Sequence, residues 1–458
     1  MTNISNILDI GRTALLAQQK AIDITGRNIA NADTQGYTRQ RVTFSNQGPT
    51  SLSQGIVGVD IGRVYDRYLE AQITSAIQAT GRWNSQQSGL ERIEILFDES
   101  SGTGLSQRLN AFWNAWMDLS NLPSGPVERN QLLARSRELT TLFNGLSANL
   151  SQLQQQANTT IKHTIDSINA IAGQLAELNG RIRQGDLAGS ETNALKDARL
   201  QLLKELAEKV DVTAHEQEDG TLSVTLASGN PLVENTRFME LDTAPPGIGP
   251  FQDAIVWVDG QGNETVITDQ IGSGELKGLL EVRDQIIPDI MGRLDSLAGG
   301  MITEVNAVHT NGRALDGTQN AFFTGSTAAD ITVNTAILND PDKIAAAGPS
   351  ESVPGGNGAA LAISALQSAA LMNGGTTNFG QYYTSLVSDI GGDLQTANLN
   401  ASHQHDVSAG LVAYRESISG VSLDEEMVRL IQYQHAFEAA AQLINVADEM
   451  LETVIQMI

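Results

Sequence analysis

Residues 430–458 read LIQYQHAFEAAAQLINVADEMLETVIQMI, and this stretch decides the fold. Large apolar side chains occupy every seventh position in it: Leu430, Phe437, Ile444, Leu451 and Ile458. A strict seven-residue repeat is typical of the seam of a coiled coil, whereas a helix on a globular core shows a wider apolar face. The C-terminus is therefore expected to be a long helix that packs on another helix along its length.

The N-terminus carries the same repeat. Its apolar residues at this spacing are Leu8, Leu15, Ile22 and Ile29. We expect the two ends to pair as a coiled coil, and we assign these nine residues to an assembly seam. Because two exposed helices bury few side chains, such a pair is expected to order fully only against copies of itself or related chains. That behaviour is typical of a subunit of an assembly.

Between the two ends, the apolar pattern is mostly helical. Helices are expected over about 71–97, 104–121, 127–183 and 192–209. From about residue 211 the pattern alternates instead, with turn signals at Ser228-Gly-Asn-Pro231 and at Asp259-Gly260. The predicted fold is therefore mainly α with a β-rich insertion, and it combines paired terminal helices with a helical-bundle middle domain.

These changes of pattern divide the chain into three expected parts. Residues 1–70 together with 405–458 are predicted to form a terminal coiled-coil domain. Residues 71–210 together with 276–404 are predicted to form a helical domain. Residues 211–275 are predicted to form a small inserted β-rich domain.

The composition excludes several classes of partner and site. The chain has 458 residues, with 53 acidic against 28 basic side chains and a net charge of −25. This balance argues against binding the phosphate backbone of a nucleic acid. The absence of cysteine removes disulfides and thiolate metal sites. No apolar run is long enough for membrane insertion, and the N-terminus lacks the pattern of a cleaved signal peptide.

A search for catalytic motifs gives no candidate site. The sequence contains no HExxH zinc motif, no phosphate-binding loop and no GxSxG nucleophile elbow. We therefore expect no enzyme activity, no metal and no cofactor. An alternative from another class is a surface adhesin or hydrolase on a helical stalk, with 211–275 as its active part. That segment holds no convergent cluster of Asp, Glu and His, which argues against this alternative.

The stretch Asn28-Ile-Ala-Asn-Ala-Asp-Thr-Gln-Gly-Tyr-Thr-Arg-Gln40 has the residues of a helix terminator. Its glycine permits a positive φ, and its Asn, Asp and Thr side chains can bind nearby backbone. The stretch closely resembles the signature of bacterial flagellar axial proteins, which usually has proline where this chain has Gln35. The residues that carry the match are Asn31, Thr34, Gly36, Tyr37 and Arg39.

Further blocks resemble the FlgK family of hook-associated proteins. They include Ser419–Met427, Ile431–Ala439, Phe322–Ser326 and Asp340–Ala345. The resemblance implies a structural adaptor at the hook–filament junction that polymerises through its terminal helices. It also implies a nested order, with the terminal helices innermost, a helical domain outside them and the β domain outermost. Another axial subunit such as the hook protein is the nearest alternative, and the first and third of these blocks argue against it.

The same resemblance implies partners and a location. The implied partners are copies of the chain itself, the hook protein, the second hook-associated junction protein and an export chaperone on the C-terminal helix. The implied location is extracellular, on the flagellum, after export by the flagellar type III apparatus without a cleaved signal peptide. The motif loop at 31–41 is expected to connect the layer of terminal helices to the next layer.

Overall fold

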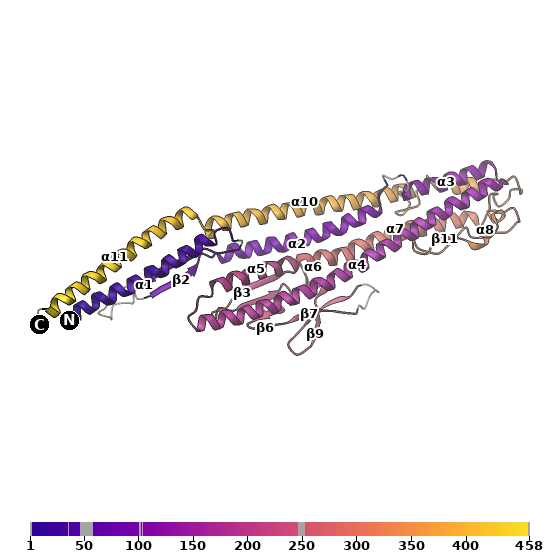
Figure 1. Ribbon diagram of the computed structural model, residues 1–458. Coiled ribbons are helices and arrows are strands. Elements are labelled where there is room, and N and C mark those ends of the chain that lie inside the picture. Colours follow the sequence, from indigo (N-terminus) through magenta and orange to yellow (C-terminus); the bar gives the residue numbers. More distant parts are fainter. Residues whose placement is uncertain are drawn as a thin grey trace.

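A computed structural model gives the fold. It describes residues 2–34, 36–45, 58–99, 102, 104–245 and 252–456. The chain forms a long rod with both termini at the same end (Figure 1). The chain runs out along the rod and returns, so segments from the two halves of the sequence lie side by side.

The two terminal helices form a separate layer at this end of the rod. Helix α1 (Thr2–Ala30) lies antiparallel to α11 (Leu423–Gln456). A two-stranded antiparallel hairpin, β1 (Gln40–Ser45) and β2 (Gly58–Arg63), packs against α1. The buried side chains of this contact are Ala21, Ile24 and Val42.

The rod itself is built from long helices. Helix α2 (Arg67–Leu96) runs beside α10 (Phe379–Ser419), and α3 (Leu105–Asn121) turns back into the 62-residue α4 (Pro126–Leu187). The remaining elements with helical backbone are α5 (Asn193–Lys209), η1 (Thr268–Gln270), α6 (Gly274–Glu281), η2 (Val282–Ile286), α7 (Ile287–His309), α8 (Thr335–Asn339), η3 (Pro341–Lys343) and α9 (Gly358–Ala365).

Two antiparallel sheets flank the middle of the rod. The first contains β3 (Val212–Glu216), β4 (Leu222–Leu226), β5 (Pro231–Glu234) and β6 (Arg237–Phe238). The second contains β7 (Glu240–Ala244), β8 (Ala254–Val258) and β9 (Glu264–Val266). Their inward side chains share one core with α4, α5 and α6, so the inserted segment is not an independently packed unit.

The far end of the rod has its own aromatic core. Phe112 and Trp116 of α3 contact Phe322, which lies close to the small hairpin of β10 (Phe323–Thr324) and β11 (Thr332–Val333). His309 at the end of α7 is fully buried against the same rings. Its Nδ1 lies 2.5 Å from the Asn320 carbonyl, and its Nε2 accepts a hydrogen bond from the Ala345 amide at 2.9 Å.

The mainly α fold with a β-rich insertion is confirmed, and three details differ from the expectation. The sheets lie along the side of the rod, whereas α3, α8 and α9 form the end farthest from the termini. The boundary expected at 404/405 falls inside α10, which continues to Ser419 before the chain turns at Gly420. The β1–β2 hairpin lies within 1–70, where the expectation included a helix and the motif loop but no strands.

Candidate assembly interface

Helices α1 and α11 pack closely because α1 presents small residues at their contact. A Cβ atom built on Gly11 would lie 2.7 Å from Cγ1 of Ile444, so the two backbones approach more closely here than a larger residue would allow. Ala21 of α1 and Ala440 and Ala447 of α11 are buried in the same contact. Both helices therefore place small side chains at the contact, and Gly11 makes room for the larger Ile444.

The predicted C-terminal seam residues lie on the face of α11 that packs on α1. Leu430, Phe437, Ile444 and Leu451 are all half-buried, and they alternate with the positions of Ala440 and Ala447. Ile458 lies outside the described residues. Because the spacing of these positions alternates between three and four residues, they form a continuous line along the helix.

The predicted N-terminal residues lie beside the contact line. Leu8, Leu15, Ile22 and Ile29 are half-buried, and each follows by one residue a position on the line through Ile7, Ala14, Ala21 and Asn28. One residue corresponds to about 100° around a helix, so these large side chains flank the seam. Large side chains lie beside the contact line because the two helices approach closely at its centre, and small residues there permit that approach.

The motif loop begins where α1 ends. Asn31 donates from Nδ2 to the Arg27 carbonyl at 2.9 Å, and Thr34 donates from Oγ1 to Oδ1 of Asn31 at 3.3 Å. Gly36 has a φ of +82°, and a Cβ atom there would lie 1.7 Å from Nε2 of Gln201 on α5. The positive φ therefore favours glycine here, and a larger residue would also displace the side chain of Gln201. Gln35 lies outside the described residues.

Asn28, on the last full turn of α1, organises the motif loop. Its Oδ1 accepts hydrogen bonds from the Tyr37 hydroxyl at 2.8 Å and from the Gln40 amide at 3.0 Å. Its Nδ2 donates to the Gln40 carbonyl and to Oε2 of Glu426, both at 2.9 Å. Burial raises the pKa of Tyr37 to about 12, so its hydroxyl remains a hydrogen-bond donor.

Arg39 joins this loop to the first turn of α11. Its Nε donates to Oε1 of Glu426 at 2.8 Å, and its Nη2 donates to Oε2 of Glu425 at 2.6 Å. Glu426 is 1% exposed, so its carboxylate depends on Arg39 and Asn28 for compensation. The Arg39 amide also donates to the Ser419 carbonyl at 3.1 Å, which fixes the loop to the end of α10.

A second group of contacts attaches the terminal layer to α5. The buried Asp197 accepts from the Thr38 amide at 3.2 Å and pairs with Nη1 of Arg63 at 2.9 Å. Before α5 begins, Glu191 pairs with Arg27 at 2.6 Å and with Lys20 at 3.5 Å. The motif loop therefore lies at the point where α1, α5, α10 and α11 meet.

Sequence reasoning did not identify Asp197 and Glu426 as members of this site, and it included Asn28 only as part of a helix terminator. Glu426 stands in the row of acids at the start of α11, a pattern that indicates favourable interaction with the helix N-terminus. Its seam position, seven residues before Tyr433 and fourteen before Ala440, was the available signal for a buried carboxylate.

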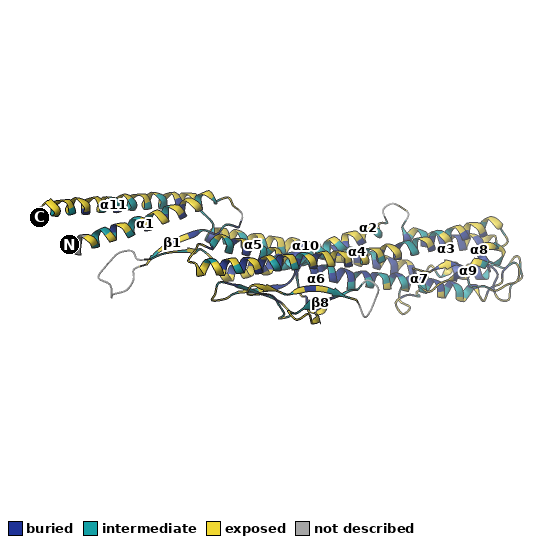
Figure 2. Cartoon of the chain, turned by 60° about the horizontal axis from the view of Figure 1, so that its bottom comes forward, coloured by how far each residue is buried: buried dark blue, intermediate teal, exposed yellow. Residues whose placement is uncertain are grey.

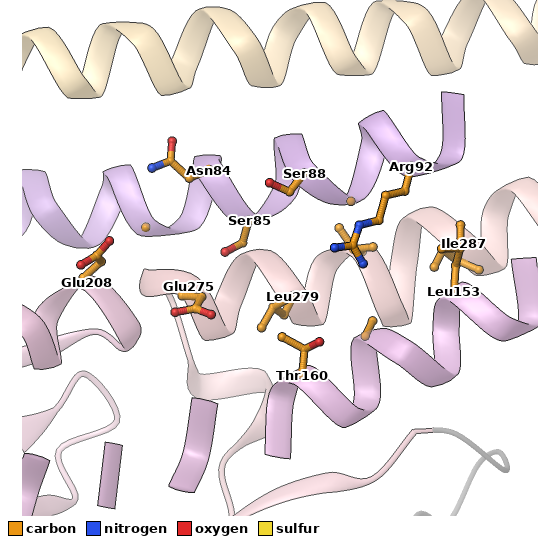
Figure 3. A pocket seen from close by; sticks show the side chains of 14 residues that line it. Asn84, Ser85, Ser88, Arg92, Leu153, Thr160, Glu208, Glu275, Leu279 and Ile287 are labelled. Atoms are coloured by element: carbon orange, nitrogen blue, oxygen red, sulfur yellow. The ribbon is translucent and has the colours of Figure 1, made fainter. Parts of the chain in front are cut away.

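A cavity of about 310 Å³ lies between α2, α4 and α6 (Figure 3). Arg92 reaches into it from α2, and Glu275 reaches into it from α6. The Glu275 carboxylate accepts from Thr164 at 3.1 Å and pairs with Lys209 at 3.4 Å. The ionisable side chains that line the cavity are those of Glu208, Glu275 and Arg92. Among the described residues, no group of His, Cys, Asp and Glu is arranged to hold a metal ion.

Comparison with known proteins agrees with this geometry. Residues 8–38, which contain most of α1 and most of the motif loop, match a family model described as flagella basal body rod protein. Residues 415–457, which contain α11, match the flagellar basal body rod FlgEFG protein C-terminal model. The paired ends thus define a structural protein of the flagellar axis. In the described part of the chain, no helix is long and apolar enough to cross a bilayer.

The middle of the chain is more specific. Residues 90–323 match the family model described as flagellar hook-associated protein FlgK helical domain, and the chain belongs to this family. The protein is therefore a part of the bacterial flagellum.

Relatives match along the whole chain. Flagellar hook-associated protein 1 of Bacillus subtilis is 28% identical, and the match covers 99% of this chain and 98% of that protein. The protein of the same name in Escherichia coli is 26% identical, with 99% of this chain and all of that protein covered. The structure of the flagellar hook junction protein FlgK from Burkholderia pseudomallei has the same fold, with a TM-score of 0.69 and 15% identity. That match covers 76% of this chain and 100% of the other.

Proposed function

We propose that the chain is a subunit of the hook–filament junction and polymerises there through the layer formed by α1 and α11. The observation that carries the proposal is the placement of this layer. It projects from the end of the rod as two helices, and Figure 2 shows α11 with a long exposed face. Large seam side chains such as Leu430 and Phe437 remain half-buried in the single chain. Neighbouring subunits would complete their burial.

The network around Arg39 supports a mechanical role for the motif loop. A buried ion pair with extra hydrogen bonds fixes geometry because breaking it leaves a charge without compensation. Here the network joins α1, α10 and α11 through Asn28, Arg39 and Glu426. The loop would thus hold the terminal layer at a set angle to the rod when the assembly bears load.

The proposed partners follow from a place at the junction. Copies of the chain would lie beside one another, with the hook protein on one side and the second hook-associated junction protein on the other. An export chaperone would cover the apolar face of α11 before assembly, as an amphipathic helix binds in a groove. The chain would reach this extracellular position through the flagellar type III apparatus without a cleaved signal peptide.

A substitution in the seam tests the proposal. Phe437→Asp introduces a carboxylate into a contact that assembly would desolvate, so the variant should fail to incorporate and cells should lose filaments. Gln442→Asp is the matched control, because the same charge enters an exposed position of α11. Normal incorporation of Phe437→Asp, measured by immunoblotting of purified flagella, would contradict assembly through this seam.

A further inference from the structure

The chain contains five Asn-Gly pairs, which begin at Asn144, Asn179, Asn311, Asn357 and Asn373. In such a pair the backbone nitrogen of the glycine can attack the carboxamide of the asparagine, because glycine has no side chain to hinder the approach. The attack requires that the carboxamide and the glycine amide are both free to move. The five pairs differ in this respect, so their surroundings decide which of them can react.

Two of the pairs lie inside helix α4. The helix holds each glycine amide on the carbonyl of the residue four positions earlier. The carboxamides are held as well, because Nδ2 of Asn144 donates to the Ala328 carbonyl at 2.8 Å and Nδ2 of Asn179 donates to the Asn235 carbonyl at 2.6 Å. Neither pair is free to react in the folded chain.

The pair at Asn311 follows the end of α7 and is also held at both points. Nδ2 of Asn311 donates to the Ala307 carbonyl at 2.7 Å. The amide of Gly312 donates to the Val308 carbonyl at 3.1 Å. Both bonds must break before the glycine nitrogen can reach the carboxamide.

The pair at Asn357 precedes α9 and is held in the same way. Nδ2 of Asn357 donates to the Ser120 carbonyl at 2.9 Å, which joins it to the end of α3. The amide of Gly358 donates to Oε2 of Glu351 at 2.8 Å. This pair is therefore blocked by contacts with two other segments.

The pair at Asn373 is different, because it lies in an exposed turn between α9 and α10. Asn373 and Gly374 have φ values of +50° and +67°, and the turn is closed by the next amide, which Gly375 donates to the Met372 carbonyl at 3.1 Å. Within the part of the chain that the structure describes, neither the Asn373 carboxamide nor the Gly374 amide has a hydrogen-bond partner. Both reacting groups are therefore free.

We propose that Asn373 is a site of spontaneous deamidation. The Gly374 nitrogen forms a bond to Cγ of Asn373, the bond between Cγ and Nδ2 breaks, and Nδ2 leaves as ammonia with the proton of the glycine amide. The product is a five-membered succinimide. Water then opens this ring at either of its two carbonyls. One opening gives aspartate, and the other gives isoaspartate, in which the main chain passes through Cγ.

The reaction changes both charge and backbone at this turn. Either product adds one carboxylate, and isoaspartate also adds one methylene to the main chain. The extra atom falls between Met372 and Thr377, whose backbone groups bond to each other at 2.9 and 3.2 Å. This pairing directly precedes α10, which begins at Phe379. Isoaspartate therefore loosens the segment that leads into α10.

Mass spectrometry of the purified full-length chain tests the proposal. The chain is incubated at mildly alkaline pH in water labelled with heavy oxygen and is then digested at acid pH, where deamidation is slow. Peptides that contain each of the five pairs are quantified, and chromatography separates the aspartate form from the isoaspartate form. A second sample is incubated in concentrated urea, which removes the hydrogen bonds of the folded chain.

In the folded chain Asn373 should deamidate faster than Asn311 and Asn357 by about tenfold or more, because two hydrogen bonds protect each of the other pairs. Both products should appear at position 373 with one heavy oxygen atom each, and urea should largely remove the difference between the pairs. Equal rates at Asn373 and Asn311 in the folded chain would overturn the proposal. Aspartate without isoaspartate would exclude the succinimide, and a difference that persists in urea would exclude selection by the fold. None of these outcomes depends on a place in the flagellum, so they leave the proposed function to its own test.

Discussion

The Nε atom of Arg39 lies 2.8 Å from Oε1 of Glu426, although 387 positions separate the two residues in the chain. The contact joins the motif loop after α1 to the first turn of α11, and Asn28 donates to the other oxygen of the same carboxylate. The side chains of Arg39 and Glu426 are 12% and 1% exposed. The terminal layer thus has a buried polar anchor at the end where it meets the rod.

Loss of Arg39 should loosen this end of the terminal layer. In Arg39→Met the carboxylate of Glu426 keeps only its hydrogen bond from Asn28, and removing one partner of a buried pair costs roughly 3 kcal/mol or more. Hydrogen exchange should therefore quicken in the first turns of α11 while the middle of α4 keeps its protection. Arg41→Met, at an exposed position of β1, is the control and should match the wild type. Equal protection in both variants would argue against the anchor.

Two glycines of α1 should respond oppositely to alanine. No atom lies within 4 Å of a Cβ atom built on Gly26, so Gly26→Ala should stabilise the helix by about 0.5–1 kcal/mol. In Gly11→Ala the same gain is opposed by overlap with Ile444, and overpacking costs roughly 1–3 kcal/mol. Hydrogen exchange of the α1 amides, measured at increasing temperature, should show a more stable helix in Gly26→Ala and a less stable helix in Gly11→Ala. Stabilisation by both would mean that α1 and α11 are farther apart.

His309 should make stability depend on pH in the acid range. Burial lowers its pKa to about 4 from 6.5, so the unfolded chain binds the proton more readily than the folded chain. Its contribution is complete above pH 6.5 and falls by roughly 3 kcal/mol as the pH drops to about 4. His309→Gln should lack this loss. The measurement is the difference in unfolding free energy between the wild type and His309→Gln, determined with denaturant at several pH values. A difference that stays constant with pH would contradict the role assigned to His309.

Asp211 should act in the opposite direction. Burial raises its pKa to about 6, although the Gly272 amide donates to its Oδ2 at 2.7 Å. The folded chain therefore holds this proton more readily, and stability from this residue falls as the pH rises from about 4 through 6. Asp211→Asn keeps an acceptor oxygen for Gly272 and should be the more stable protein at pH 8 by roughly 2 kcal/mol, with little difference at pH 4. An unchanged difference across this range would contradict the assignment.

The sequence predicted the elements that show a regular apolar pattern over many consecutive residues. The helix expected over 104–121 is found at Leu105–Asn121, and strands begin at Val212, where the alternation begins. The hairpin of β1 and β2 was missed because each strand has only six residues and is stabilised by packing on α1. The domain boundary expected at 404/405 lies inside a helix, because α10 continues without a break to Ser419.

Parts of the site depend on contacts that a linear pattern does not contain. The seven-residue repeat selected the largest side chains of α1, such as Leu15, whereas the centre of its contact is small at Gly11 and Ala21. Size matching between helices is a property of the pair, so the sequence of one helix does not reveal it. The partners of Glu426 are likewise determined only when the two ends of the chain meet.

Location on the flagellum tests the central claim most directly. Antibody against the exposed turn at 259–263 can be applied to intact flagella and detected with gold in the electron microscope. The account predicts a narrow band of label at the distal end of the hook, between hook and filament. Label along the whole hook, or no label on any flagellum, would contradict a subunit of the hook–filament junction.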